Sequence, residues 1–145
     1  MSLSRSLAAA LALGLSAGAA FAQDAAPLVT VVTADHPQTQ LMAMVLTSQA
    51  AQQGHAVRVL LCGPGGDMAL ADGPEGVTAP QPPMGASPQG LLTQLIANGA
   101  TVEVCAIYLP GLGADASVLI EGVTVAQPPA MAAAMAAEGS IVWSF

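Results

Sequence analysis

The chain has 145 residues, of which nine are acidic and two are Lys or Arg, and its formal net charge is −7 at pH 7. Hydrophobic residues make up 54% of the sequence, which is enough for the core of one domain. Because nucleic acid and anionic membrane surfaces bind basic patches, we expect neither of them as a partner.

The first residues have the composition of a secretory signal peptide. Arg5 is followed by an apolar run, and Ala20-Phe21-Ala22 places small side chains at the two positions that signal peptidase reads. The apolar run is shorter than the roughly 20 residues that span a bilayer as a helix. We therefore expect residues 1–22 to be a cleaved signal peptide. Residues 23–145 should then be a single domain, periplasmic or secreted and without a membrane anchor.

A strand, a helix and a second strand are predicted next. Residues 28–33 are mostly β-branched, which favours a strand, and Asp35-His36-Pro37 after it is typical of a helix start. Gly54 suits the end of that helix, and the apolar run 56–61 predicts a strand buried on both faces of a parallel sheet. Four residues at helical spacing lie on one side of the helix, which we interpret as its apolar face: Leu41, Met44, Val45 and Ser48.

The middle of the chain changes composition. Residues 62–86 are rich in Gly, Pro, Asp and Gln, and we interpret them as a long surface excursion with a helical turn near residues 67–71. Ser87-Pro88 predicts the start of a second helix, which ends at Asn98-Gly99. Residues 101–107 predict the third strand.

The last part of the chain continues the alternation of strands and helices. A glycine-rich loop should be followed by a short helix at 115–120, a strand at 123–126, an Ala/Met helix at 128–138 and a strand at 140–145. This alternation predicts an α/β fold with a parallel sheet and helices on both faces. Ligands of such sheets bind at the carboxyl ends of the strands.

Both cysteines fall near the carboxyl end of a predicted strand. Parallel pairing would bring Cys62 and Cys105 toward the same edge of the sheet. A structural disulfide and two buried inert thiols are the ordinary interpretations. The functional interpretation is a reactive thiolate at Cys105, stabilised by backbone N–H groups of Gly111 to Gly113 and by the start of the following helix. Arg58 is unsuitable for this role, because an extended strand places it about 13 Å from Cys62.

Histidine, glycine and methionine patterns give weaker indications of a functional site. His36 could serve as a base or metal ligand, but beside Asp35 and before Pro37 it is better explained as a helix cap. Gly63-Pro-Gly-Gly66 is not followed by Lys-Ser/Thr, so we predict no nucleotide site. Methionines permit a soft-metal hypothesis, although those on predicted helices usually fill the core, and we predict neither a metal nor a cofactor.

Three segments resemble the DsrE/DsrF-like (DsrEFH) family of small sulfur-relay proteins. They are Val-Thr-Ala-Asp-His-Pro at 32–37, Gly-His-Ala-Val-Arg-Val-Leu-Leu-Cys-Gly-Pro-Gly at 54–65, and the helix, glycine, strand and cysteine order of 91–105. The resemblance covers residues 28–145. It implies a three-layer α/β/α domain with a mainly parallel five-stranded sheet, assembled as a homo-oligomer. It also implies that Cys105 occupies the persulfide position and that a sulfur donor or acceptor protein is the partner.

Two functional hypotheses follow. In the first, the chain is an exported sulfurtransferase-like carrier in which Cys105 accepts sulfane sulfur and passes it on as a persulfide. In the second, it is a non-catalytic periplasmic module that binds a small ligand, a soft metal or a partner protein, with Cys62 and Cys105 structural or disulfide-bonded. Beside the catalytic candidate Cys105, the candidate binding residues are Cys62, Asp35, His36, Gly111 and Gly113.

Overall fold

The fold is built on one sheet of five parallel strands, which confirms the predicted fold class. The computed structural model describes residues 25–145, so the expected signal peptide lies outside the described residues. The strand order is β4-β3-β2-β1-β5, and every neighbouring pair is parallel. The strands are β1 (Leu28–Val32), β2 (Val57–Leu61), β3 (Thr101–Val104), β4 (Val123–Val125) and β5 (Ile141–Ser144).

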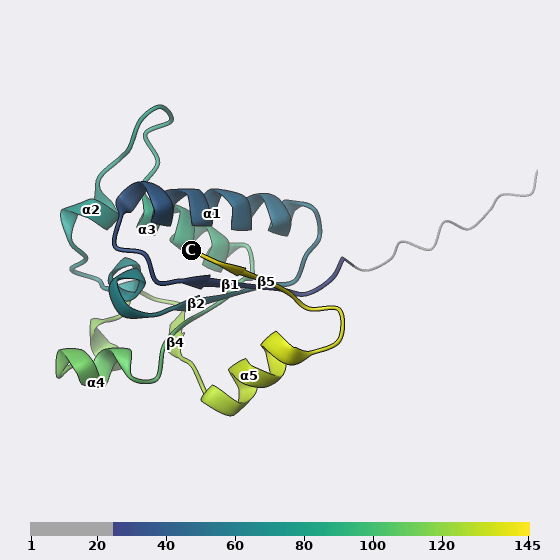
Figure 1. Cartoon of the computed structure of the whole chain (residues 1–145). Coiled ribbons are helices and arrows are strands. Elements are labelled where there is room, and N and C mark those ends of the chain that lie inside the picture. Colours follow the sequence, from purple (N-terminus) through teal and green to yellow (C-terminus); the bar gives the residue numbers. More distant parts are fainter. Residues whose placement is uncertain (1–24) are drawn as a thin grey trace, which may run out of the picture.

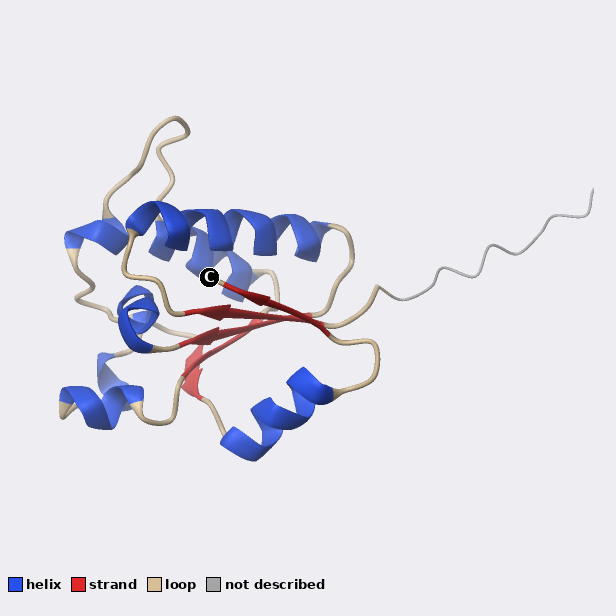
Figure 2. Ribbon diagram, viewed as in Figure 1, coloured by secondary structure: helices blue, strands red, loops and turns tan. Residues whose placement is uncertain are grey.

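Helices cover both faces of the sheet and complete three layers. Helices α1 (Pro37–Gln52) and α3 (Pro88–Ala97) lie on one face, and α5 (Pro128–Ala136) lies on the other, as Figure 1 shows. Four shorter helices fill the connections: the 3₁₀ helix η1 (Gly63–Ala69), α2 (Glu75–Thr78), α4 (Tyr108–Leu112) and the 3₁₀ helix η2 (Ala116–Val118). The strand arrows of Figure 2 point toward the edge where η1 and α4 lie. Within residues 25–145, no helix has the length and apolar character needed to cross a membrane.

The two faces of the sheet carry separate apolar cores, because successive side chains of a strand point to opposite faces. The larger core contains Leu28, Val59 and Leu61 together with residues of α1 and α3. The smaller core contains Val29 and Leu60, and α5 contributes Met131 to it. Burial on both faces explains why the central strands read as nearly continuous apolar runs.

Both long helices begin where the sequence predicts, because their caps are local. The His36 ring Nδ1 accepts a hydrogen bond from the Gln38 N–H at 3.3 Å, and the Ser87 hydroxyl accepts one from the Gly90 N–H at 3.1 Å. A proline follows each cap, and its fixed φ suits the first turn of a helix. The start of each helix is thus set by residues within three positions of its cap.

The apolar face predicted for α1 is wrong for three of its four residues. Leu41, Val45 and Ser48 are only half-buried, whereas Met44 is buried as expected. The buried face of α1 is instead made of small and polar residues together with Met44: Gln40, Ala43, Met44, Thr47 and Ala50. The Gln40 side-chain N–H donates to the carbonyl of Ala34 at 2.8 Å, and the Thr47 hydroxyl hydrogen-bonds to the Thr30 hydroxyl at 3.0 Å. The Gln40 Oε1 atom is buried without a hydrogen-bond partner among the described residues.

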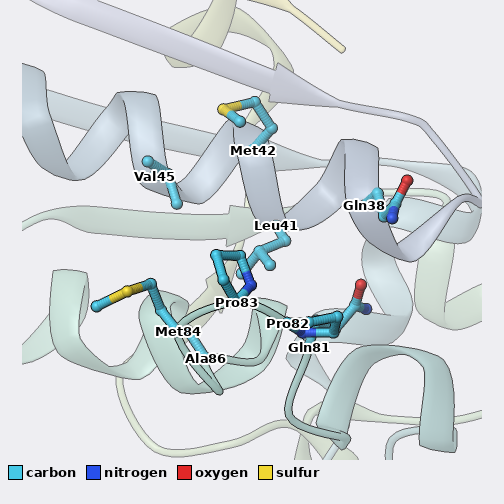
Figure 3. A pocket seen from close by; sticks show the side chains of 9 residues that line it. All are labelled: Gln38, Leu41, Met42, Val45, Gln81, Pro82, Pro83, Met84 and Ala86. Carbon is cyan, nitrogen blue, oxygen red and sulfur yellow. The ribbon is translucent and has the colours of Figure 1, made fainter.

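Because α1 buries a different face from the predicted one, some of its apolar side chains face outward. Met42 and Val45 line a cavity of about 310 Å³ between α1 and the loop of residues 81–86 (Figure 3). Met84, at the tip of this loop, is 87% exposed. The cavity lining contains no titratable side chain, so this cavity has no acid, base or nucleophile of its own.

Two connections differ from the sequence predictions. Residues 62–86 are not a surface excursion throughout, because η1 buries Gly65, Gly66, Met68 and Ala69 against the sheet. The predicted glycine-rich loop after the third strand contains a helical turn, α4, and the short helix predicted at 115–120 is confined to η2. Strand β3 also ends at Val104, so that Cys105 directly follows the strand.

Candidate functional site

The two cysteines are joined at the carboxyl edge of the sheet. Cys62 follows β2 and Cys105 follows β3, and the two strands are neighbours. The ladder continues past the strand ends, because the Cys105 N–H donates to the Leu61 carbonyl at 2.8 Å and the Cys62 N–H donates to that of Val32 at 3.0 Å. Their Cα atoms lie 5.1 Å apart and their sulfurs form a disulfide. The predicted proximity is confirmed, and the pair is in the oxidised form.

Strand alternation places the disulfide on the side of the sheet that faces α5. Leu61 and Val104 belong to the core under α1 and α3, so the next side chains along the two strands turn to the opposite face. There Cys62 and Cys105 pack against the small core of Val29, Leu60 and Met131, and Cys105 also contacts the larger core. Both cysteines are only half-buried. The disulfide therefore joins two half-buried residues over an apolar support.

The glycines of Gly63-Pro-Gly-Gly66 serve close packing. A Cβ atom on Gly65 would collide with the backbone carbonyl of Val32, and a Cβ atom on Gly66 would collide with the ring of Tyr108. Only glycine lets η1 approach both the end of β1 and the tyrosine ring. The motif thus holds η1 tightly beside the disulfide.

A hydrogen bond joins the two segments that follow the cysteines. The Tyr108 hydroxyl donates to Asp67 Oδ1 at 2.7 Å, linking α4 to η1. Burial of the ring raises the pKa of Tyr108 well above its usual range, and the hydrogen bond to the Asp67 carboxylate and its negative charge add to this effect. Tyr108 therefore stays a neutral donor and fixes the position of the Asp67 carboxylate.

A cavity of about 410 Å³ opens between these two segments. It begins one residue after Cys62 and two residues after Cys105, and its lining is Gly63, Pro64, Asp67, Ile107, Tyr108, Gly111 and Leu112. Ile107 is 81% exposed and Leu112 is 52% exposed. The cavity is thus apolar at its rim and contains one carboxylate.

None of the described Lys or Arg side chains lies near this edge. Arg58 is the only Lys or Arg in residues 25–145, and its Nε lies 3.1 Å from Glu103 Oε2. It pairs in register with Thr101, the first residue of β3, so it lies toward the opposite end of the sheet from the disulfide. The expectation that Arg58 is remote from Cys62 is confirmed.

The prediction that backbone N–H groups of Gly111 and Gly113 supply positive potential to Cys105 is wrong. The Gly111 N–H donates to the Ile107 carbonyl at 3.0 Å, and the Gly113 N–H donates to that of Pro110 at 3.1 Å. Both glycines lie at the carboxyl end of α4, where Gly113 adopts a φ of 65° as the cap. The negative end of a helix dipole does not stabilise a thiolate. Gly111 instead contributes to the lining of the cavity.

The other candidate residues lie apart from this cavity. His36 is the N-cap of α1, as expected, and Asp35 beside it is exposed. Both follow β1 at the carboxyl edge, but neither belongs to the lining beside the disulfide. Within residues 25–145, no three His, Cys, Asp or Glu side chains come together as a metal site would require.

Comparison with known proteins establishes the fold. No family model and no curated protein matches the sequence. Among solved structures, the YchN protein from E. coli superposes with a TM-score of 0.61 at 20% identity, and the match covers 83% of this chain and 99% of that one. The protein of unknown function MTH1491 from Methanobacterium thermoautotrophicum gives a TM-score of 0.60 at 17% identity, with the same coverage. The chain therefore has a DsrE-like fold.

Proposed function

We propose that this protein is an exported sulfur-handling protein of the DsrE type, in which Cys105 carries sulfane sulfur as a persulfide and Cys62 is its partner thiol. The observation that supports this most is the half-buried disulfide at the carboxyl edge of the sheet, beside an open cavity. This edge is where ligands of parallel α/β sheets bind. The signal-peptide composition of residues 1–22 supports export to a compartment in which disulfides persist.

The cycle starts by opening the disulfide with a thiol reductant. A thiolate attacks one sulfur of the pair, the Cys62–Cys105 bond breaks, and the leaving sulfur takes up a proton. A second thiol of the reductant releases the mixed disulfide, so that two reductant thiols become one disulfide and the protein becomes a dithiol. The Cys105 thiolate then attacks the outer sulfur of a persulfide donor. The donor leaves as a thiolate, and Cys105 holds the transferred sulfur.

The Cys105 persulfide can react in two ways, and only one of them requires the Cys62 thiol. An acceptor thiolate can attack the outer sulfur, in which case Cys105 leaves as a thiolate and the acceptor becomes the persulfide. Alternatively, Cys62 attacks the inner sulfur, which restores the Cys62–Cys105 disulfide and releases hydrosulfide. Because the two Cα atoms lie only 5.1 Å apart, the second route competes in the wild type. Removing the Cys62 thiol should therefore trap the persulfide.

Intact mass after treatment with a persulfide donor tests this proposal. Reduced Cys62→Ser should gain one sulfur, about 32 Da, and lose it again on reduction. Reduced Cys105→Ser should gain nothing, and reduced wild type should return to the disulfide mass while releasing about one sulfide per chain. A gain in Cys105→Ser but not in Cys62→Ser would assign the carrier to Cys62. No gain in either variant would refute sulfur handling.

A non-catalytic binding module is the second candidate. Two observations favour it: the disulfide ties together the ends of the neighbouring strands β2 and β3 across 43 residues, and the apolar cavity beside α1 has no reactive group (Figure 3). In this role the disulfide is structural and the ligand occupies the apolar cavity. The mass experiment separates the two candidates, because in a structural role the free Cys105 thiol of reduced Cys62→Ser is not activated to attack a donor and should gain no sulfur.

A further inference from the structure

The cavity beside the disulfide has an uneven charge distribution. Asp67 is the only Asp, Glu, His, Lys or Arg of its lining, and Tyr108 donates a hydrogen bond of 2.7 Å to its carboxylate. The one described cation, Arg58, is bound to Glu103 toward the opposite end of the sheet. A thiolate or carboxylate that enters the cavity therefore meets negative potential with no cation to offset it.

The rim of the same cavity is apolar and uncovered. Ile107 and Leu112 project from the two ends of α4 with 81% and 52% of their surface exposed, and the exposed Pro64 belongs to the lining on the η1 side. Exposed apolar surface at the rim of a cavity is typical of a docking site for a protein segment. Neither cysteine belongs to the lining, but the lining residues Gly63 and Ile107 follow Cys62 and Cys105 by one and two residues. A small thiol reaching the disulfide would leave Ile107 and Leu112 in water, whereas a peptide segment can cover both.

Building on the sulfur-handling function, we propose that the cavity selects a cysteine on an apolar, positively charged segment of a partner protein. Lys or Arg of that segment pairs with Asp67, and its apolar side chains cover Ile107 and Leu112. The partner's thiolate attacks one sulfur of the pair and the Cys62–Cys105 bond breaks. The leaving cysteine takes up a proton, and the two proteins are joined by a mixed disulfide that a second thiol of the partner then releases. A cysteine flanked by acidic side chains is disfavoured by the same carboxylate.

Two model peptides of opposite charge test this selectivity. One has the sequence Lys-Leu-Cys-Leu-Lys and the other Glu-Leu-Cys-Leu-Glu, both with blocked ends, and their rates of opening the wild-type disulfide are compared at equal thiolate concentration. We expect the basic peptide to react on the order of 10 times faster at low ionic strength, with the ratio falling at 1 M salt.

Variants assign the selectivity to the cavity. Asp67→Asn keeps an oxygen that can accept from Tyr108 but removes the charge, and it should bring the ratio of the two rates close to 1. Glu138→Gln is the matched control, because Glu138 is an exposed acid before β5, at the opposite edge of the sheet, and it should leave the ratio unchanged. Ile107→Ser should slow both peptides.

The outcomes separate this inference from the function on which it rests. Equal rates for the two peptides, a faster acidic peptide, or a ratio that survives Asp67→Asn would overturn the charge selectivity while leaving sulfur handling intact. Failure of both peptides and of dithiothreitol to open the disulfide in the folded protein would overturn both proposals.

Discussion

Reduction of the disulfide should lower the stability of the fold by an amount set mainly by the loop that it closes. Cys62 and Cys105 are 43 residues apart. In the chain-entropy description, a cross-link over this separation removes about 4 kcal/mol of conformational freedom from the unfolded chain. The native strands β2 and β3 pair independently of the disulfide, so the folded state itself should change little.

Urea unfolding of the oxidised and reduced wild type measures this difference. With a slope of about 2 kcal/mol per M, typical of a chain of this size, the midpoint should fall by about 2 M on reduction. The double variant Cys62→Ser/Cys105→Ser is the control, since it should match the reduced wild type and ignore added reductant. A midpoint shift below about 0.5 M would refute the chain-entropy reasoning for this pair.

The same experiment bears on function. A sulfur carrier must remain folded as a dithiol, so the reduced protein should still show a cooperative transition. A reduced chain that is unfolded in the absence of urea would instead favour the structural role of the disulfide.

Three further predictions concern the surroundings of the site. Gly66→Ala should lower the free energy of unfolding, measured in urea, by about 1–3 kcal/mol, because its Cβ would collide with the Tyr108 ring. In the control Gly111→Ala the added Cβ meets nothing within 4 Å, so the loss should be no more than a few tenths of a kcal/mol. Equal effects would contradict the packing role of Gly66. The pKa of Tyr108 is raised in the folded state, so its contribution is fully present below the ordinary pKa of 10.0 and is lost as the pH rises further. Tyr108→Phe should therefore unfold less steeply than wild type above that pH in an alkaline titration followed by circular dichroism, and identical curves would count against it. His36→Ala should lower the free energy of unfolding by about 1 kcal/mol through loss of the α1 cap, and His36→Asn should restore most of it; failure of this rescue would show that capping is not what His36 contributes.

The elements that the sequence predicts correctly depend on neighbouring residues. The caps at His36 and Ser87 act within three residues, and the strands follow from runs of β-branched and apolar side chains. The alternation of these elements was sufficient to predict a parallel sheet, and parallel pairing was sufficient to place Cys62 and Cys105 toward the same edge, where the structure joins them.

The features that the sequence did not reveal depend on residues that are distant along the chain. The buried face of α1 contains Gln40 and Thr47, whose partners lie on the segment before α1, on η1 and on β1, so apolar spacing alone selected the wrong face. The contact between Asp67 and Tyr108 spans 41 residues and has no local signal. The adjacent glycines at 65 and 66 were the one indication that another segment approaches closely there.

The measurement that tests the central claim most directly is the intact mass of reduced Cys62→Ser after exposure to a persulfide donor. We predict a gain of about 32 Da that reductant removes, because Cys105 holds the transferred sulfur and no neighbouring thiol displaces it. An unchanged mass, with Cys105 shown to be reduced and open to alkylation, would contradict the role of Cys105 as a sulfur carrier.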